Sequence, residues 1–95
     1  MPDITAEVRL PTQELREDLP FFTERLGMRL DMIYPADDPQ VAVVSGHGLR
    51  LRIEKGASEP PGTLRLLSDT PDAVAQGARE LTAPNGTRIE IAEKN

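Results

Sequence analysis

The residue types that most often carry out chemistry are scarce in this sequence. It contains no cysteine, which excludes disulfides, thiolate catalysis and cysteine-ligated zinc or iron–sulfur sites. His47 is the sole histidine and lies in a predicted Ser-Gly-His-Gly turn, where a lone histidine is expected to be solvent-exposed rather than catalytic. The sequence shows no serine–histidine–aspartate order, glycine-rich phosphate loop or metal-spaced histidine pair. The remaining candidates are carboxylates and arginines.

Charged residues alternate with apolar ones along several predicted strands, which places them together on the polar strand faces. Guanidinium groups bind carboxylate or phosphate through paired hydrogen bonds, so one hypothesis is a site for an anionic small molecule with Glu7 or Glu90 as a catalytic base. The alternative, which we favour, is a structural arginine–glutamate network that closes a cleft or a subunit interface, since solvated strand faces are often charged. The arginines concerned are Arg9, Arg50, Arg52, Arg65 and Arg88.

Composition limits the classes of partner. The chain has 95 residues, a formal net charge of −5 and a pI of about 4.8, which argues against nucleic acid and anionic membranes as partners. Its three aromatic residues, Phe21, Phe22 and Tyr34, predict an aliphatic core. No apolar run has the length of a membrane span and no export signal begins the chain, so we expect a cytoplasmic protein.

The first half predicts four strands and one helix. Ile4, Val8 and Leu10 share one face of the first strand, and we expect the helix to cover that face of a four-stranded antiparallel sheet. Thr12 is the predicted helix cap, and Gly27 is predicted to end the helix. Pro20 interrupts the helical pattern and should either kink the helix or restart it with Asp18 as a local cap. The predicted strands span residues 4–10, 28–34, 41–44 and 49–54, and the helix spans residues 13–26.

The second half is shorter. Residues 55–62 form a linker, residues 63–67 a strand, and Thr70-Pro71 the start of a helix that extends to about Leu81. Residues 83–86 form a turn before a final strand at residues 87–92, with Ile89 and Ile91 facing inward. The fold class predicted is α+β in a single domain: a complete βαβββ module in residues 1–55 and a truncated βα…β half-module in residues 63–95.

Two segments carry a resemblance to a known family. LPTQELREDLPFFTERLGMRLDMI, residues 10–33, resembles the opening of the glyoxalase/bleomycin-resistance/extradiol-dioxygenase (vicinal-oxygen-chelate) family, in which a helix ends in a Phe-Phe or Phe-Tyr pair before Leu-Gly and a second strand. APNGTRIEIAE, residues 83–93, is similar to that family's closing turn and strand. Both motifs occur in the right order around a βαβββ plan.

The resemblance implies two βαβββ modules around a cleft, but the second module here lacks room for its two middle strands. One chain should therefore supply only part of the walls of the cleft. Exposed strand edges invite pairing, so we expect a homodimer or a domain of a larger protein.

The resemblance also implies four positions for ligands of a divalent metal. Glu7 and Glu90 fall on two of them, whereas Arg52 (or Arg50) and Gly62 or Thr63 fall on the others. Arginine cannot bind a cation, and two carboxylates without histidine suit Mg²⁺ or Ca²⁺ better than Fe²⁺ or Zn²⁺. We therefore expect no complete metal site and no cofactor; a divalent metal, if present, would use Glu7 and Glu90.

Three functions follow. The leading hypothesis is a small-molecule-binding domain without a working metal centre. The second is a metal-dependent lyase, isomerase or dioxygenase whose site is completed across a dimer. The third is a structural or regulatory module that binds no ligand.

Overall fold

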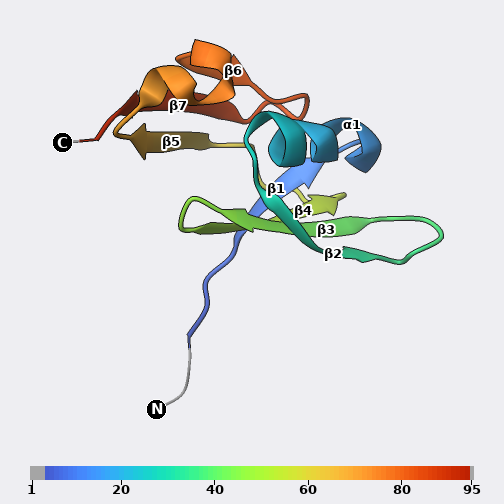
Figure 1. Cartoon of the computed structure of the whole chain (residues 1–95). Helices are drawn as coiled ribbons and strands as arrows, with labels where there is room; N and C mark the ends of the chain where they lie inside the picture. The colour runs from blue at the N-terminus through green and yellow to red at the C-terminus, as the bar shows by residue number, and fades with distance from the viewer. Residues whose placement is uncertain (1–3, 95) are drawn as a thin grey trace.

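The computed structural model describes residues 4–94, which form two sheets and one short helix (Figure 1). The first sheet lies below the second in this view, and the helix packs above the first sheet. The first half contains β1 (Val8–Thr12), α1 (Leu15–Pro20), a π-helical turn (Phe21–Arg25), β2 (Arg29–Tyr34), β3 (Val41–Gly46) and β4 (Leu49–Lys55). The second half contains β5 (Thr63–Ser68), two 3₁₀ turns (Pro71–Ala73 and Ala75–Gly77), β6 (Glu80–Thr82) and β7 (Arg88–Glu93).

The first sheet has the strand order β1-β4-β3-β2 and is mixed rather than antiparallel throughout. β1 runs parallel to β4, whereas β4–β3 and β3–β2 are antiparallel. The prediction of a purely antiparallel sheet was therefore wrong. The helix after β1 carries the chain across the sheet, so β2 forms the far edge and β4 returns beside β1 in the same direction, as a crossover connection allows.

β1 begins and ends later than the alternation predicted. Leu10 and Thr12 are buried under the helix, but Val8 is exposed and Ile4 lies outside the strand, 91% exposed. The helix thus covers the predicted face only at Leu10. Pro11, predicted as a turn residue, is inside the strand, which is tolerated because β1 is an edge strand.

The helix is shorter than predicted and changes its winding at Pro20. The carboxylate of Glu14, not Thr12, accepts the backbone N–H of Arg16 at the first turn. Proline offers no N–H to the helical ladder, and the chain continues as a wider π-helical turn instead of restarting with Asp18 as a cap. Gly27 ends this segment with φ of 72°, as predicted.

The second sheet has the order β5-β7-β6, with β5 parallel and β6 antiparallel to β7. The long helix predicted after Thr70-Pro71 was wrong. Ala75 and Gln76 have φ of 48° and 61°, outside the right-handed helical region, so only two 3₁₀ turns form. β6 was also missed: the second module retains one of the two middle strands expected to be absent.

One core joins the two halves. Leu51 and Ile53 of β4, Phe22 of the π-helical turn and Ile89 of β7 are completely buried and belong to the same cluster. Ile89 and Ile91 face inward as predicted. Within residues 4–94, no helix is long and apolar enough to cross a membrane. The apolar faces of both sheets therefore meet in one interior, and their polar faces turn away from it.

Candidate functional site

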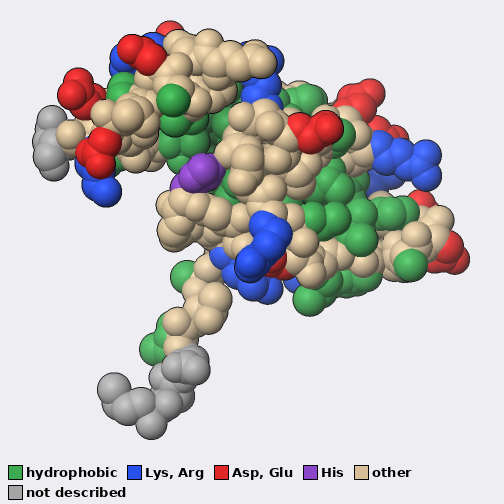
Figure 2. Space-filling model, in the orientation of Figure 1, with side chains coloured by type: hydrophobic (Ala, Val, Ile, Leu, Met, Phe, Trp, Pro, Cys, Tyr) green, Lys and Arg blue, Asp and Glu red, His purple; other side chains and the backbone are tan. Residues whose placement is uncertain are grey.

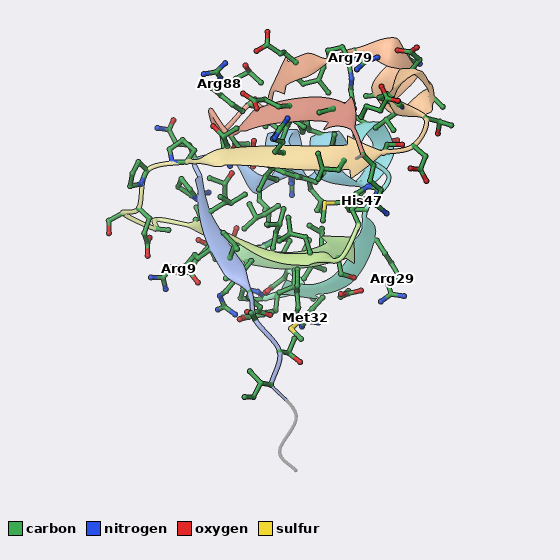
Figure 3. All side chains as sticks on the ribbon, turned by 90° about the vertical axis from the view of Figure 1, so that its left-hand side faces the viewer. Arg9, Arg29, Met32, His47, Arg79 and Arg88 are labelled. Carbon is green, nitrogen blue, oxygen red and sulfur yellow. The ribbon has the colours of Figure 1, made fainter. Side chains whose placement is uncertain are left out.

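The first sheet exposes one face on the side opposite the core, which we call the outer face. Strand register defines it: Arg52 of β4 lies opposite Arg9 of β1 and Val43 of β3, and Val43 lies opposite Met32 of β2. In Figure 3, Met32 extends below the first sheet, away from β5 and β7. The outer face is formed by Arg9, Met32, Tyr34, Val41, Val43, Arg50, Arg52 and Glu54, together with Glu7, which precedes β1 and contacts Arg50.

Apolar and aromatic groups lie in the centre of the outer face. Val43 is only 1% exposed although no backbone layer covers this side of the sheet, so long neighbouring side chains shield it. The guanidinium of Arg52 lies 5.7 Å from the ring centroid of Tyr34, within the range of a cation–π contact. Tyr34 and Met32 remain exposed. The result is an apolar floor bordered by an aromatic ring and a stacked guanidinium.

Carboxylates pair with the arginines on this face. Arg50 donates to Glu7 at 2.7 Å and lies 3.6 Å from Asp31, which also accepts from Arg29 at 2.8 Å. A hydrogen bond from Ser45, followed by that from Arg29, lowers the pKa of Asp31 below its ordinary value. Asp31 therefore stays ionised at neutral pH and shares Arg50 with Glu7.

The other two arginines of the first sheet are paired as well. Arg52 donates to Glu54 at 2.8 Å. Arg9 pairs with Glu59 of the linker and lies 3.9 Å from Glu54. The hydrogen bond from Arg9 lowers the pKa of Glu59, and the same bond raises that of Arg9. Each of the four arginines of the first sheet thus has a carboxylate partner, so the outer face is close to neutral.

The second sheet holds the remaining predicted residues. Arg65 lies 3.9 Å from Glu90, and Arg88 lies 3.5 Å from Glu80. The three side chains Arg65, Arg88 and Glu80 are more than 60% exposed, and Glu90 is 40% exposed. These pairs are open to solvent and contribute little to stability.

The structure divides the predicted residues into two separate sets. Figure 3 shows Arg9 on the lower, first sheet and Arg88 at the top, on the second. Glu7 pairs with Arg50, and Glu90 lies near Arg65, each within its own sheet. Among residues 4–94, no group of three or more acidic or histidine side chains is arranged to hold a metal ion.

His47 is exposed, as expected of the β3–β4 turn. Its Nε2 lies 2.6 Å from the carbonyl oxygen of Leu26, so it fastens the turn to the end of the helical segment. His47 and Gly48 both have positive φ, which fits a two-residue hairpin turn. This is a structural contact rather than a catalytic one.

Sequence reasoning missed several residues of the outer face. Asp31 lies in a bulge between Leu30 and Met32, and a bulge leaves no mark in a simple alternation. Glu59 comes from the linker, whose path the sequence does not define. Tyr34 and Glu54 could have been found, because Tyr34 ends a predicted strand and Glu54 alternates with Arg52.

Proteins that resemble this chain are found among solved structures. The sequence matches no protein-family model and no curated protein. Its structure is similar to lactoylglutathione lyase from Agrobacterium tumefaciens, with a TM-score of 0.71 and 15% identity over 97% of this chain and 94% of that one. It is also similar to a bleomycin-binding protein from Streptomyces verticillus, solved with copper(II)-bleomycin (0.66, 15% identity, 100% and 99% covered). A fosfomycin resistance protein from Listeria monocytogenes gives 0.70 at 11% identity, with 100% and 94% covered.

These three proteins belong to the vicinal-oxygen-chelate superfamily, and the α+β fold of this chain is the glyoxalase/bleomycin-resistance fold. The resemblance stated from residues 10–33 and 83–93 is confirmed at the level of fold. At such low identity the likeness carries no ligand or reaction to this chain.

Proposed function

We propose that this chain is a small-molecule-binding protein that uses the outer face of the first sheet, without a metal ion. The observation that carries the proposal is the Tyr34–Arg52 pair beside the shielded Val43. Small-molecule sites typically combine an apolar floor with a few well-placed polar groups. The outer face offers that combination.

The first sheet suits this role better than the second. No aromatic residue lies on the second sheet, whose polar face carries only solvent-exposed ion pairs. On the first sheet, the side chains of Arg50 and Arg52 are only about one-third exposed. Partial burial strengthens charged hydrogen bonds, so a ligand gains more from these arginines than from Arg65 or Arg88.

The charge balance restricts the ligand. Because Glu7 and Glu54 already pair with Arg50 and Arg52, a highly charged anion would have to displace both carboxylates. A molecule with a flat apolar body and a single acidic group needs to displace only one. Its ring would stack on Tyr34, and its acid would replace Glu54 at the guanidinium of Arg52.

A second copy of the chain completes the site in this proposal. All six residues of β2 are exposed, and Leu30, Met32, Ile33 and Tyr34 are large and apolar. In Figure 2, hydrophobic side chains gather at the lower right, over the region of β2. An exposed apolar edge strand favours association, and a partner there would supply the wall that one chain lacks.

Naphthalene-2-carboxylate is a suitable probe, because it combines a flat apolar body with one acid. We expect it to raise the melting temperature and to bind measurably by calorimetry. Arg52→Ala and Tyr34→Ala should each weaken binding by at least about fivefold, the scale of one cation–π or stacking contact. Arg65→Ala on the second sheet is the matched control. Equal loss in the control, or no binding by the unmodified protein, would refute the proposal.

Elemental analysis of the same protein, purified without chelator, tests the proposal that the chain works without a metal ion. We expect little bound transition metal and no change in melting temperature with chelator, because the paired carboxylates need no cation to stay ionised. A stoichiometric metal that is lost on Glu90→Gln substitution would instead support the metal-dependent enzyme completed across a dimer.

A further inference from the structure

A cavity of about 620 Å³ lies where the two halves of the chain meet, at the start of α1. Its walls come from the end of β1, the beginning of α1, the linker after β4 and the turn before β7. Three prolines, Pro11, Pro61 and Pro84, provide apolar walls, and Asp18 and Asn85 provide polar ones. None of the residues that line this cavity belongs to the outer face as defined above.

Asp18 is the unusual residue of this cavity. It is only 2% exposed, and one of its carboxylate oxygens, Oδ2, accepts the hydroxyl of Thr12. The other oxygen, Oδ1, has no hydrogen-bond partner among the described residues. Burial raises the pKa of Asp18 above its ordinary value, while hydrogen bonding from the Thr12 hydroxyl and from the nearby backbone N–H of Asn85 opposes that effect. A buried carboxylate oxygen without a partner is costly, so a donor that reached it would be strongly favoured.

The charge around the cavity is negative and uncompensated. Glu14 and Glu17 lie at its rim with Asp18, and Lys55 is the one basic residue that lines it. Within the described part of the chain, none of these four side chains belongs to an ion pair. On the outer face, by contrast, each arginine already has a carboxylate partner. The cavity therefore attracts a cation.

Hydrogen bonds hold the cavity walls in place. The side-chain amide of Asn85 donates to the carbonyl oxygen of Pro11 at 2.8 Å, and its Oδ1 accepts the backbone N–H of Thr87 at 3.0 Å. The turn before β7 is thus fastened to the end of β1. A site framed in this way is preformed, which reduces the entropy lost on binding.

We propose that this cavity binds a small organic cation of the primary-amine class, with Asp18 as its counter-ion. An ammonium group carries three donors and no acceptor, which suits a carboxylate with a free oxygen and two neighbouring glutamates. Its hydrocarbon chain lies against the three prolines. A divalent metal fits less well, because it requires several converging oxygen ligands and the described residues form no such cluster.

Butylamine, butanol and butyrate are matched probes of the same size and different charge. In nitrogen–proton correlation spectra, butylamine should cause saturable shifts at the Asn85 side-chain amide and the backbone amides of Lys55 and Gly56. Butanol and butyrate should not. Asp18→Asn should weaken butylamine binding at least about tenfold, the scale of a charged hydrogen bond. Asp38→Asn, which removes an exposed loop carboxylate, is the control and should leave binding unchanged.

Lys55→Gln keeps the test decisive if Asp18→Asn fails to fold. Removing this cation should tighten butylamine binding roughly two- to fivefold, the scale of one exposed charge pair. Unchanged or weaker binding in Lys55→Gln would overturn the proposal. So would equal shifts with butanol, or binding that survives in folded Asp18→Asn. None of these results depends on the outer face, so the two sites succeed or fail separately.

Discussion

The two halves of the molecule follow the same pairing plan with different completeness. In each, the first strand runs parallel to the last, β1 with β4 and β5 with β7, and the strand before the last pairs antiparallel. The first half adds β2 and a helix; the second has only 3₁₀ turns in the helix position and a three-residue β6. The shared part contains the fully buried residues Leu51, Ile53 and Ile89.

This difference shows which parts of the module the core requires. The parallel pair is present in both halves, and its last strands carry the fully buried residues Leu51, Ile53 and Ile89, so the core depends on it. The outer strand buries none of its own residues, because β2 is exposed along its whole length even where it is present. β2 instead adds exposed surface. It contributes Met32 and Tyr34 to the outer face, and its free edge can associate with another copy of the chain.

The largest expected effect concerns the single core that joins the two halves. Phe22→Ala should lower the free energy of unfolding by about 3–5 kcal/mol, whereas Leu81→Ala on the short β6 should cost about 1–2 kcal/mol, because Leu81 is only half-buried. Both variants should unfold in urea in a single transition, followed by circular dichroism. Two separate transitions would show that the halves fold independently.

The second prediction concerns the edge that only the first half has. Light scattering should give a dimer mass for the unmodified chain, and Met32→Lys on β2 should weaken association at least about tenfold, since a charge at an exposed edge opposes pairing. Leu67→Lys, at an exposed apolar position of β5, should leave the mass unchanged. A monomer at high protein concentration would count against the dimer.

A third prediction concerns Asp18, which lies where the halves meet. Its raised pKa means that the folded chain binds this proton more tightly than the unfolded chain does. The stability it contributes is present below the ordinary aspartate range and is lost as pH rises through the folded pKa. Relative to the unmodified chain, Asp18→Asn should therefore gain stability as pH rises above the ordinary aspartate range and through the folded pKa. Urea unfolding at each pH measures this, with Asp38→Asn, which removes an exposed loop carboxylate, as the matched control.

The smallest effects compare the polar faces. Arg52→Ala should lower the melting temperature slightly but measurably, because it removes the contact with Tyr34 and the bond to Glu54. Arg65→Ala, whose distance to Glu90 is 3.9 Å, should cost close to nothing. If the two substitutions lowered thermal stability equally, the outer face of the first sheet and the polar face of the second would contribute alike to stability.

The sequence predicted the features that depend on local pattern. The strands at residues 28–34 and 49–54, the glycine that ends the helical segment and the inward Ile89 and Ile91 follow from periodicity and turn chemistry. The two motifs at residues 10–33 and 83–93 indicated the fold correctly.

Features that depend on distant partners were missed. β6 forms only because β7 lies beside it, and the parallel pairing of β1 depends on where the helix carries the chain. The residues of the candidate site were likewise predicted only where local alternation was sufficient. Alternation placed Arg50 and Arg52 on one face, but the partners Asp31 and Glu59 come from a bulge and a linker, whose positions tertiary structure determines.

The parallel pairing of β1 with β4 also has a kinetic consequence. Because Val8 pairs with Leu51, the N-terminal strand has no neighbour in the sheet until the residues of β4 have been synthesised and positioned. Contacts between such distant segments slow folding, since a long loop must close first. During translation, the β3–β4 hairpin should therefore form early, and β1, although synthesised before it, should be among the last strands to join the sheet.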